Sequence, residues 1–554
     1  MGILDSIDNG LAGLFGQWNA YSTGLMTALV AVVSYGIMTS REPDVHPLLL
    51  ARQSVASPVR NEGESAVYRS QAAPHGMPLN SGLNVKDAGA ARWSRGRDGD
   101  LRDVWRKAVT GDDKGAKGRM LTVLGSEKVV EHALSDVTRQ INIIGRHIAD
   151  GGGIRVAMYL PNSVELLAAL LACSFYPNLT AVLVPFDASE DELISMLKRS
   201  AVDTLVAAPG TFSLDAVVEA YPSLRQLIWV VDEGNSHMDW SDGVGDRVKV
   251  VTWRDLVKEA PASVSSEVPA LDLNHSPQDV VTFWQGKPGQ AGEMVRFTQA
   301  NIVSGVAGQL AAIPTRDRMG PWDLFLPVDA LTNIHTLVLT LTALYSNASL
   351  ALNSVAGRAA DLVLATQGIA PTVVVAGPET LLTMHKESAV RVASGLGKLS
   401  HAMSTRTLAG QGVFAPSNVL SVFSPRAAIG TTPGKLRLVY AADRAGAGMA
   451  RLSSTVLSDL RIMMGARIVY ALSAARVAGA VSQTALFDYR VDEGSHFGAP
   501  PTSVEVLLRD KGEHKTTDET IEGEIVARGP CVSGTEASTG IVGRMRPDQT
   551  LSCI

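Results

Sequence analysis

The chain has 554 residues, of which 46% are hydrophobic and 19% are charged, so extensive disorder is excluded and roughly three or four structural units are expected. The formal net charge of −6 provides no basic field, and we therefore expect no nucleic acid partner. The sequence predicts neither a disulfide framework nor a zinc site, because its cysteines are odd in number and mostly far apart: Cys173, Cys531 and Cys553.

The N-terminal region is a long stretch without charged side chains. No Lys, Arg, Asp or Glu occurs between Gly10 and Ser40, and residues 25–38 are mostly apolar. Because a membrane span needs about 20 mainly apolar residues, we expect residues 1–40 to anchor the chain in a lipid bilayer. A buried or interfacial helix is the alternative. Arginines follow this stretch, so we expect the large domain on the cytosolic side of the endoplasmic reticulum or a related membrane.

The next residues lead into a periodic pattern. Residues 41–118 are rich in Arg, Gly, Pro and Ser and predict a polar segment. The charge-dense run 92–106 predicts a solvated, partly ordered stretch, with a basic-aromatic surface as the alternative. Apolar residues at helical spacing predict a helix over 128–148. We then expect strands alternating with helices: strands at 154–160, 181–185 and 204–208, and helices at 161–176 and 190–200. Such alternation predicts a parallel sheet covered on both faces.

The same alternation returns later in the chain. We expect a long helix at 331–345 and strands at 323–327, 349–352, 372–375 and 436–440. Residues 486–534 do not continue this alternation. Their short apolar runs, separated by Gly and Pro, predict antiparallel strands. The predicted fold class is α/β, with two doubly wound halves and a small β-rich subdomain. The expected division is 1–40, 41–118, 119–320, 321–485 and 486–554.

Several segments resemble, in order and spacing, motifs of the adenylate-forming superfamily, which includes acyl-CoA synthetases, luciferases and peptide-synthetase adenylation domains. Residues 153–163 are similar to its G-x-x-V-A-[IL]-x-[LM]-P-N-S segment, and residues 468–473 stand at its Y-G-x-T-E motif. Three further segments resemble the strand before its substrate-side helix and its G-x-P and G-E-[IL] segments: 324–327, 497–501 and 523–530. Residues 46–52 and 64–68 resemble a membrane-anchored fungal branch of these ligases.

The resemblance implies a two-step reaction that uses ATP with Mg²⁺ and coenzyme A. A carboxylate attacks the α-phosphate to form an acyl-adenylate, and a thiol then displaces AMP. The family holds the phosphates with a Ser/Thr/Gly-rich loop that ends in Pro-Lys-Gly. The corresponding stretch here, 282–293, lacks the run of hydroxyls and has Ala291-Gly292-Glu293 where Pro-Lys-Gly is expected. Because a carboxylate repels phosphate, Glu293 does not fit an anion cradle.

The remaining candidate nucleotide contacts lie at three places. Six candidates lie in this loop and shortly after it: Thr282, Gly286, Lys287, Gly289, Gly292 and Thr298. The alternative is a structural turn that binds nothing. Tyr470 matches the adenine-stacking tyrosine, with a packed core aromatic as the alternative, and Ser473 can take part of the threonine's role. Thr539 begins the match to T-G-D. However, Ala474 replaces the Mg²⁺-binding Glu, and Ile541 replaces the ribose-binding Asp.

His335 lies in the apolar helix expected at 331–345, where we expect a core histidine, with an acyl-pocket residue as the alternative. The chain ends at Ile554, near where the resemblance places a mobile C-terminal domain, so we expect that domain to be absent or the sequence to be truncated. We expect no catalytic residue and no metal ligand. The expected function is a degenerate, non-turnover protein that binds an acyl or nucleotide ligand, or a partner, at a membrane. The alternatives are an active long-chain acyl-CoA ligase and a structural membrane scaffold.

Overall fold

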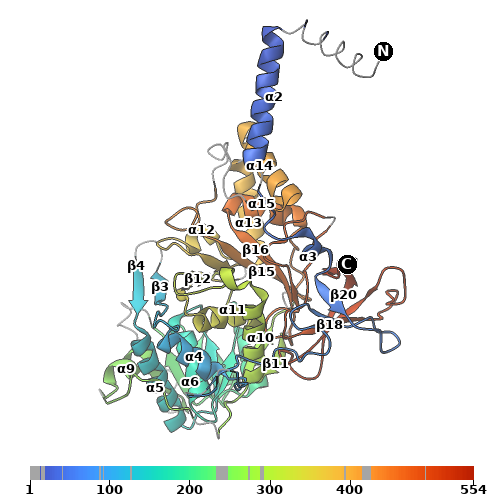
Figure 1. The fold of residues 1–554 in the computed structure, drawn as a ribbon. Helices are drawn as coiled ribbons and strands as arrows, with labels where there is room; N and C mark the ends of the chain where they lie inside the picture. The colour runs from blue at the N-terminus through green and yellow to red at the C-terminus, as the bar shows by residue number, and fades with distance from the viewer. Residues whose placement is uncertain are drawn as a thin grey trace. The chain divides into compact units, whose positions relative to one another are not determined.

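The computed structural model describes residues 13, 16, 19–39, 41–86, 89–91, 93–124, 128–231, 247–261, 263–271, 275–286, 292–357, 359–391, 395–414, 426–492 and 494–554. The chain divides into two compact units, Met1–Asp44 and Val45–Ile554. Figure 1 shows the elements of both units in the colours of the chain order.

The first unit contains the helix α2 (Ala20–Thr39). Asn19 caps it, because its Oδ1 accepts hydrogen bonds from the backbone N–H groups of Tyr21 and Ser22 at 2.9 and 3.0 Å. Hydroxyl side chains and glycines interrupt the apolar sequence of α2. Among the described residues, no helix is both long enough and apolar enough to span a bilayer. The predicted anchor at 1–40 and the predicted membrane location are therefore wrong.

Seven described strands form the first sheet of the second unit, in the order β11-β10-β6-β5-β7-β8-β9. All neighbours are parallel except β10 and β11, which form a hairpin. The strands are β5 (Arg155–Tyr159), β6 (Thr180–Leu183), β7 (Thr204–Ala207), β8 (Gln226–Trp229), β9 (Lys249–Thr252), β10 (Val280–Trp284) and β11 (Glu293–Phe297).

Both faces of this sheet are buried. Successive side chains of a strand point to opposite faces, and in β5 Val156 and Met158 belong to one apolar cluster while Ala157 and Tyr159 belong to another. The helices around the sheet are α5 (Leu134–Asp150), α6 (Val164–Phe175), α7 (Glu190–Ser200), α8 (Leu214–Ala220) and α9 (Trp253–Glu259). The prediction of a parallel sheet covered on both faces is confirmed.

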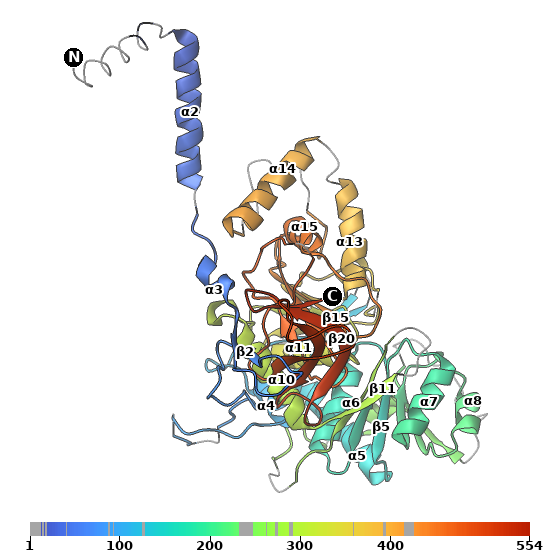
Figure 2. The ribbon, with the colours of Figure 1, turned by 90° about the vertical axis from the view of Figure 1, so that its right-hand side faces the viewer.

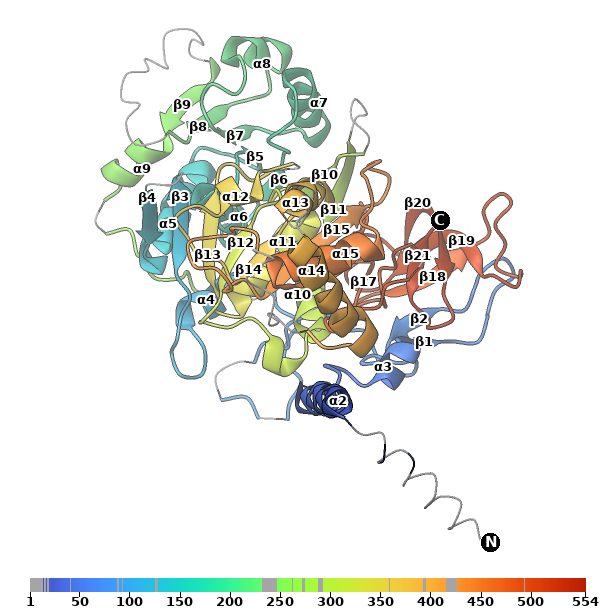
Figure 3. The same cartoon turned by 90° about the horizontal axis from the view of Figure 1, so that it is seen from above.

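Eight described strands form the second sheet, in the order β17-β16-β15-β14-β12-β13-β3-β4. Its six central strands run parallel and its two edge strands are antiparallel. In Figure 3, β5 and β7–β9 of the first sheet lie apart from β13 and β14 of the second. The strands are β3 (Met120–Leu124), β4 (Lys128–His132), β12 (Leu324–Pro327), β13 (Ser349–Asn353), β14 (Val373–Val375), β15 (Leu438–Arg444), β16 (Arg467–Ser473) and β17 (Ser482–Gln483).

Helices from several parts of the chain pack around the second sheet and against the first. Contacts join α11 to α4 and α10, and α4 to α6. Figure 2 shows α13, α14 and α15 close to one another. The bounds are α4 (Leu101–Thr110), α10 (Gln299–Ala312), α11 (Ile334–Tyr345), α12 (Leu362–Ala365), α13 (Pro378–Arg391), α14 (Gly395–Thr405) and α15 (Ser454–Met464), with short turns at Thr315–Asp317 and Arg406–Gly410.

The third sheet joins the beginning of this unit to its end. Its order is β1-β2-β18-β19-β20-β21, and its neighbouring strands are antiparallel. The predicted antiparallel pairing within 486–534 is confirmed by β18 and β19. The elements are the helix α3 (Pro47–Ala51) and the strands β1 (Ser54–Ala56), β2 (Tyr68–Ser70), β18 (Glu505–Arg509), β19 (Glu522–Arg528), β20 (Ala537–Met545) and β21 (Leu551–Cys553).

Two local predictions are wrong. The helix expected over 128–148 begins only at Leu134, because Lys128–His132 pairs antiparallel with β3. The charge-dense run 92–106 is not a solvated segment along its whole length, because it ends in α4, where Leu101, Val104 and Trp105 are fully buried. The apolar face of this amphipathic helix packs into the core, while its charges are paired locally.

Candidate functional site

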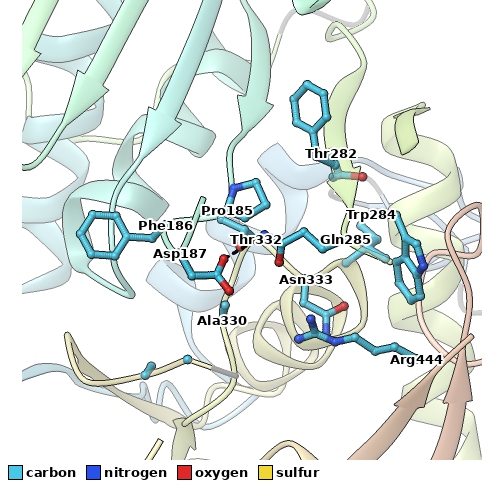
Figure 4. Close-up of a pocket in the computed structure, with 14 residues that line it drawn as sticks. Pro185, Phe186, Asp187, Thr282, Trp284, Gln285, Ala330, Thr332, Asn333 and Arg444 are labelled. Carbon is cyan, nitrogen blue, oxygen red and sulfur yellow. Dashed lines mark hydrogen bonds between the residues drawn. The ribbon is translucent and has the colours of Figure 1, made fainter. Parts of the chain in front are cut away.

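The carboxyl ends of strands from both parallel sheets border a cavity of about 100 Å³ (Figure 4). Open α/β sheets bind their ligands outside this edge of the strands. The walls come from segments after β6, β12 and β13 and from the ends of β10 and β15: Pro185–Asp187, Thr282–Gln285, Ala330, Thr332–Ile334, Ala356, Gly357 and Arg444.

The turn after β5 fixes one of these segments. Asn162, from the segment that resembles the family's P-N-S turn, is buried and donates from Nδ2 to the carbonyl oxygens of Pro327 and Asp329 at 3.1 and 2.9 Å. Its Oδ1 accepts a hydrogen bond from the backbone N–H of Leu331 at 2.8 Å. Because three hydrogen bonds hold residues 327–331, the first sheet positions the loop that leads from β12 into α11.

Asp329 is a buried carboxylate behind the cavity wall. Its Oδ1 accepts from Arg444 Nη2 at 2.7 Å and from the backbone N–H of Ala330 at 2.8 Å. Its Oδ2 accepts from Asn333 Nδ2 at 2.9 Å and Thr336 Oγ1 at 3.1 Å. Burial raises the pKa of Asp329, but the charge of Arg444 and the hydrogen bonds outweigh it and lower the pKa below its ordinary value. Asp329 is therefore ionised and fully hydrogen-bonded.

Arg444 faces the cavity from the end of β15. Only 10% of its side chain is exposed, and the bond to Asp329 is the one hydrogen bond that this side chain makes within the described part of the chain. A guanidinium carries five N–H donors, so most donors of Arg444 lack a protein acceptor there. The cavity thus combines a buried cation with unused hydrogen-bond donors.

No known family model and no curated protein matches this sequence. Solved structures do match its fold over 82% of the chain. The A domain of a carboxylic acid reductase from Segniliparus rugosus, solved with AMP and a co-purified carboxylic acid, matches over 74% of its own length with a TM-score of 0.56 and 13% identity. The N-terminal domain of FACL13 from Mycobacterium tuberculosis matches over 100% of its length (TM-score 0.56, 13% identity), and a benzoate CoA ligase from Burkholderia xenovorans over 79% (TM-score 0.53, 14% identity).

The chain has the fold of the adenylate-forming ligases. The predicted α/β fold class is therefore confirmed. The N-terminal domain of FACL13 is matched over its whole length, so the matched part of this chain corresponds to that domain. The ordered series of short motifs, rather than overall similarity, carried the prediction, since identity to these structures is only 13–14%.

The stretch matched to the phosphate loop of this fold begins and ends in strands. Thr282 is buried in β10 and lines the cavity. Gly286 follows β10, and Gly292 precedes β11, where its carbonyl oxygen accepts a hydrogen bond from Arg199 Nη1 at 2.7 Å. Lys287 and Gly289 lie outside the described residues. Of the described candidates in this stretch, Thr282 is the one that reaches the cavity.

The bulky residues Trp284 and Gln285, which follow Thr282 in the chain, line the cavity. Trp284 Nε1 donates to the carbonyl oxygen of Ala445 at 3.1 Å, and Gln285 Nε2 donates to Asp187 Oδ1 at 3.0 Å. These bonds tie the end of β10 to segments beyond β15 and β6. Gly292 stands where the family has its loop lysine, and the next residue, Glu293, pairs with the exposed Arg476 at 2.8 Å.

The other matched residues serve the protein's own structure. Thr298 caps α10 by accepting from the backbone N–H of Asn301 at 3.1 Å. Tyr470 is fully buried, its hydroxyl accepts from Leu452 N at 3.2 Å, and its ring packs on Phe497 at 5.0 Å. Burial raises the pKa of its phenol, which stays protonated.

The last two candidates are also engaged internally. Ser473 is buried at the end of β16 and donates to the carbonyl oxygen of Asp443 at 3.0 Å. Thr539 in β20 donates to the carbonyl oxygen of Ile525 at 3.0 Å. The described residues that line the cavity do not include Ser473, Thr539, Thr298 or Tyr470. These assignments as nucleotide contacts stay a prediction.

Sequence reasoning missed Asp329 and Arg444. They lie 115 positions apart, and each alone is an ordinary charged residue. A signal was present, since Asp329 lies two residues after β12 and Arg444 is the last residue of β15, both strands of the parallel sheet. Charged residues at the carboxyl ends of two buried parallel strands are expected to lie at the same sheet edge.

Proposed function

We propose that this chain is a non-turnover member of the adenylate-forming fold that binds a small acyl-type ligand without activating it with ATP. The observation that carries the proposal is the internal use of the residues matched to nucleotide contacts. Tyr470 packs in the core, Ser473 bonds a neighbouring strand, and Thr539 bonds its own sheet. A nucleotide would have to break these contacts to use the same side chains.

Electrostatics also favour this proposal. Transfer to the α-phosphate requires groups that neutralise developing negative charge. At the position of the family's Mg²⁺-binding Glu, the chain has the buried Ala474, which offers no oxygen ligand. Gly292 stands where the family has lysine and offers no cation, and the adjacent Glu293 adds negative charge, with its carboxylate in an ion pair with Arg476.

The size of the cavity points to a small ligand. Its volume is about 100 Å³ as the described residues bound it. Pockets that enclose drug-sized ligands have about 300–1,000 Å³. The cavity therefore suits a short acyl group, or one end of a longer ligand, better than a nucleoside triphosphate.

The alternative is an active acyl-CoA ligase that uses ATP, Mg²⁺ and coenzyme A with divergent motifs. The fold itself favours it, because the similar structures include CoA ligases. The two functions differ in whether Mg²⁺–ATP binds the folded chain.

Thermal unfolding with increasing Mg²⁺–ATP tests the proposal, because any ligand of the native state stabilises it, by about 2.7 kcal/mol at one hundred times its Kd. We expect no saturating rise of the midpoint beyond that given by Mg²⁺ alone. A rise that saturates at millimolar ATP would overturn the proposal in favour of the ligase.

A further inference from the structure

We propose that Arg444 is the anion-binding group of the cavity and that Asp329 is a built-in competitor for it. A ligand with an oxyanion at one end would take the Arg444 guanidinium away from Asp329. This inference rests on the proposed function, since it names the class of ligand that the same cavity takes.

The unused donors of Arg444 are the first support. The side chain is nine-tenths buried, lines the cavity, and makes one hydrogen bond to the described residues, at 2.7 Å to Asp329. Its remaining donors border the cavity, where solvent water or a ligand can accept their hydrogen bonds. A guanidinium offers a planar fork that matches the two oxygens of a carboxylate.

The surplus of partners at Asp329 is the second support. Apart from Arg444, its carboxylate accepts from the Ala330 backbone N–H and from the Asn333 and Thr336 side chains. These three bonds remain when Arg444 turns to a ligand. Asp329 therefore stays hydrogen-bonded when the guanidinium turns away, and the anionic ligand replaces Asp329 as the acceptor of Arg444.

The other walls define the rest of the ligand. Phe186, Trp284 and Ile334 provide apolar surface beside the guanidinium, and Gln285 provides an amide at the rim. The exposed Asp187 accepts the hydrogen bond of Gln285 at 3.0 Å and disfavours a second negative charge there. The cavity therefore suits an anionic head with a compact apolar body, held by one buried cation.

Acetate is the probe for a test on the full chain, and acetamide is its neutral counterpart at constant ionic strength. The fluorescence of Trp284, isolated by comparison with Trp284→Phe, and the thermal midpoint report binding. We expect acetate to bind and acetamide not to bind. Asp329→Asn removes the competitor, so acetate affinity should rise about tenfold or more, while Arg444→Lys should lower it about tenfold. If the Arg444–Asp329 pair only stabilised the fold, the Asp329→Asn variant would not bind acetate more tightly than the wild type.

The fold supplies a matched control at the other end of the same two strands. Asp323 precedes β12, Arg437 precedes β15, and they pair at 2.8 Å. Asp323→Asn should leave acetate affinity unchanged. Equal binding of acetate and acetamide, or an Asp329→Asn variant that binds no tighter than wild type, would overturn the inference. If Asp329→Asn does not fold, undiminished acetate binding by Arg444→Lys overturns it.

Phosphate as a second probe separates planar from tetrahedral anions, and tighter phosphate binding with the same dependence on Arg444 would still support the anion site. Failure of this inference is distinguishable from failure of the proposed function. Stabilisation by Mg²⁺–ATP would refute the non-turnover proposal whatever acetate does, and an acetate-insensitive cavity would refute only the assignment of Arg444.

Discussion

His335 should make the protein lose stability in mild acid. Its side chain is 1% exposed in α11, and neither ring nitrogen makes a hydrogen bond of good geometry to a described residue. Burial lowers the pKa of His335 to about 4, and the Asp329 carboxylate and the Gly479 backbone oppose this only in part. The expectation of a core histidine fits this burial, and His335 is not among the described residues that line the cavity.

The sign and size follow from linkage. The folded-state pKa of about 4 lies below the ordinary value of 6.5, so the unfolded chain takes up a proton first as the pH falls below 6.5. The stability of the native state therefore decreases from pH 6.5 down to about 4. Each pKa unit corresponds to about 1.4 kcal/mol, so lowering the pKa from 6.5 to about 4 amounts to a loss of about 3 kcal/mol.

The assay is urea denaturation between pH 6.5 and 4 of the wild type and His335→Leu. The difference between the two proteins removes the contributions of other groups, such as His147 and His496, whose pKa values burial also lowers. Leu has a similar size and no titratable group, so the variant should retain about 3 kcal/mol more of its stability over this range. Parallel losses of unfolding free energy in both proteins would refute the reasoning.

Four further variants test the site and the packing of helices. Asn162→Ala removes three hydrogen bonds from a side chain that is 4% exposed, and it should lower the unfolding free energy by about 2–4 kcal/mol in urea titrations; a loss below about 0.5 kcal/mol would contradict its role. Thr298→Ala removes a helix cap and should cost about 1 kcal/mol while acetate affinity stays the same. A fall in that affinity would place Thr298 in the ligand site. Gly305→Ala would bring a Cβ to 2.2 Å from the Ala478 carbonyl oxygen and should cost about 1–3 kcal/mol in thermal unfolding. Gly24→Ala, with no neighbouring atom within 4 Å, should instead stabilise its helix.

Much of the α/β core could be predicted because its local signals agree with its packing. The buried parallel strands read as short apolar runs, as in β5, β6 and β7. Ser163 and Ser189 mark the starts of the two following helices, since each caps its helix by accepting a backbone hydrogen bond. Pattern and packing therefore point to the same elements there.

Other elements depend on partners that are distant in the sequence. Lys128–His132 fits a helical spacing as well as a strand, and pairing with β3 decides between them. The stretch 282–293 reads as a glycine-rich loop, yet Val280–Trp284 pairs in register with Glu293–Phe297. The N-terminal stretch gives a helix, as its apolar sequence indicates, but not one that could span a membrane.

The candidate site was the least predictable part, because sequence reasoning followed the family's motif positions. Those positions hold Tyr470, Ser473 and Thr539, and the structure gives each an internal partner. The cavity instead depends on Asp329 and Arg444, whose meaning arises only when β12 and β15 bring them to one sheet edge. A single charged residue after a strand gives no such information by itself.

ATP–pyrophosphate exchange by the purified chain, with Mg²⁺ and a panel of fatty and aromatic acids, tests the central claim most directly. We expect exchange no faster than without protein for every acid, because Gly292, Ala474 and Ile541 stand where the family has its phosphate, metal and ribose ligands. Exchange that depends on the protein and is stimulated by one of the acids would contradict it.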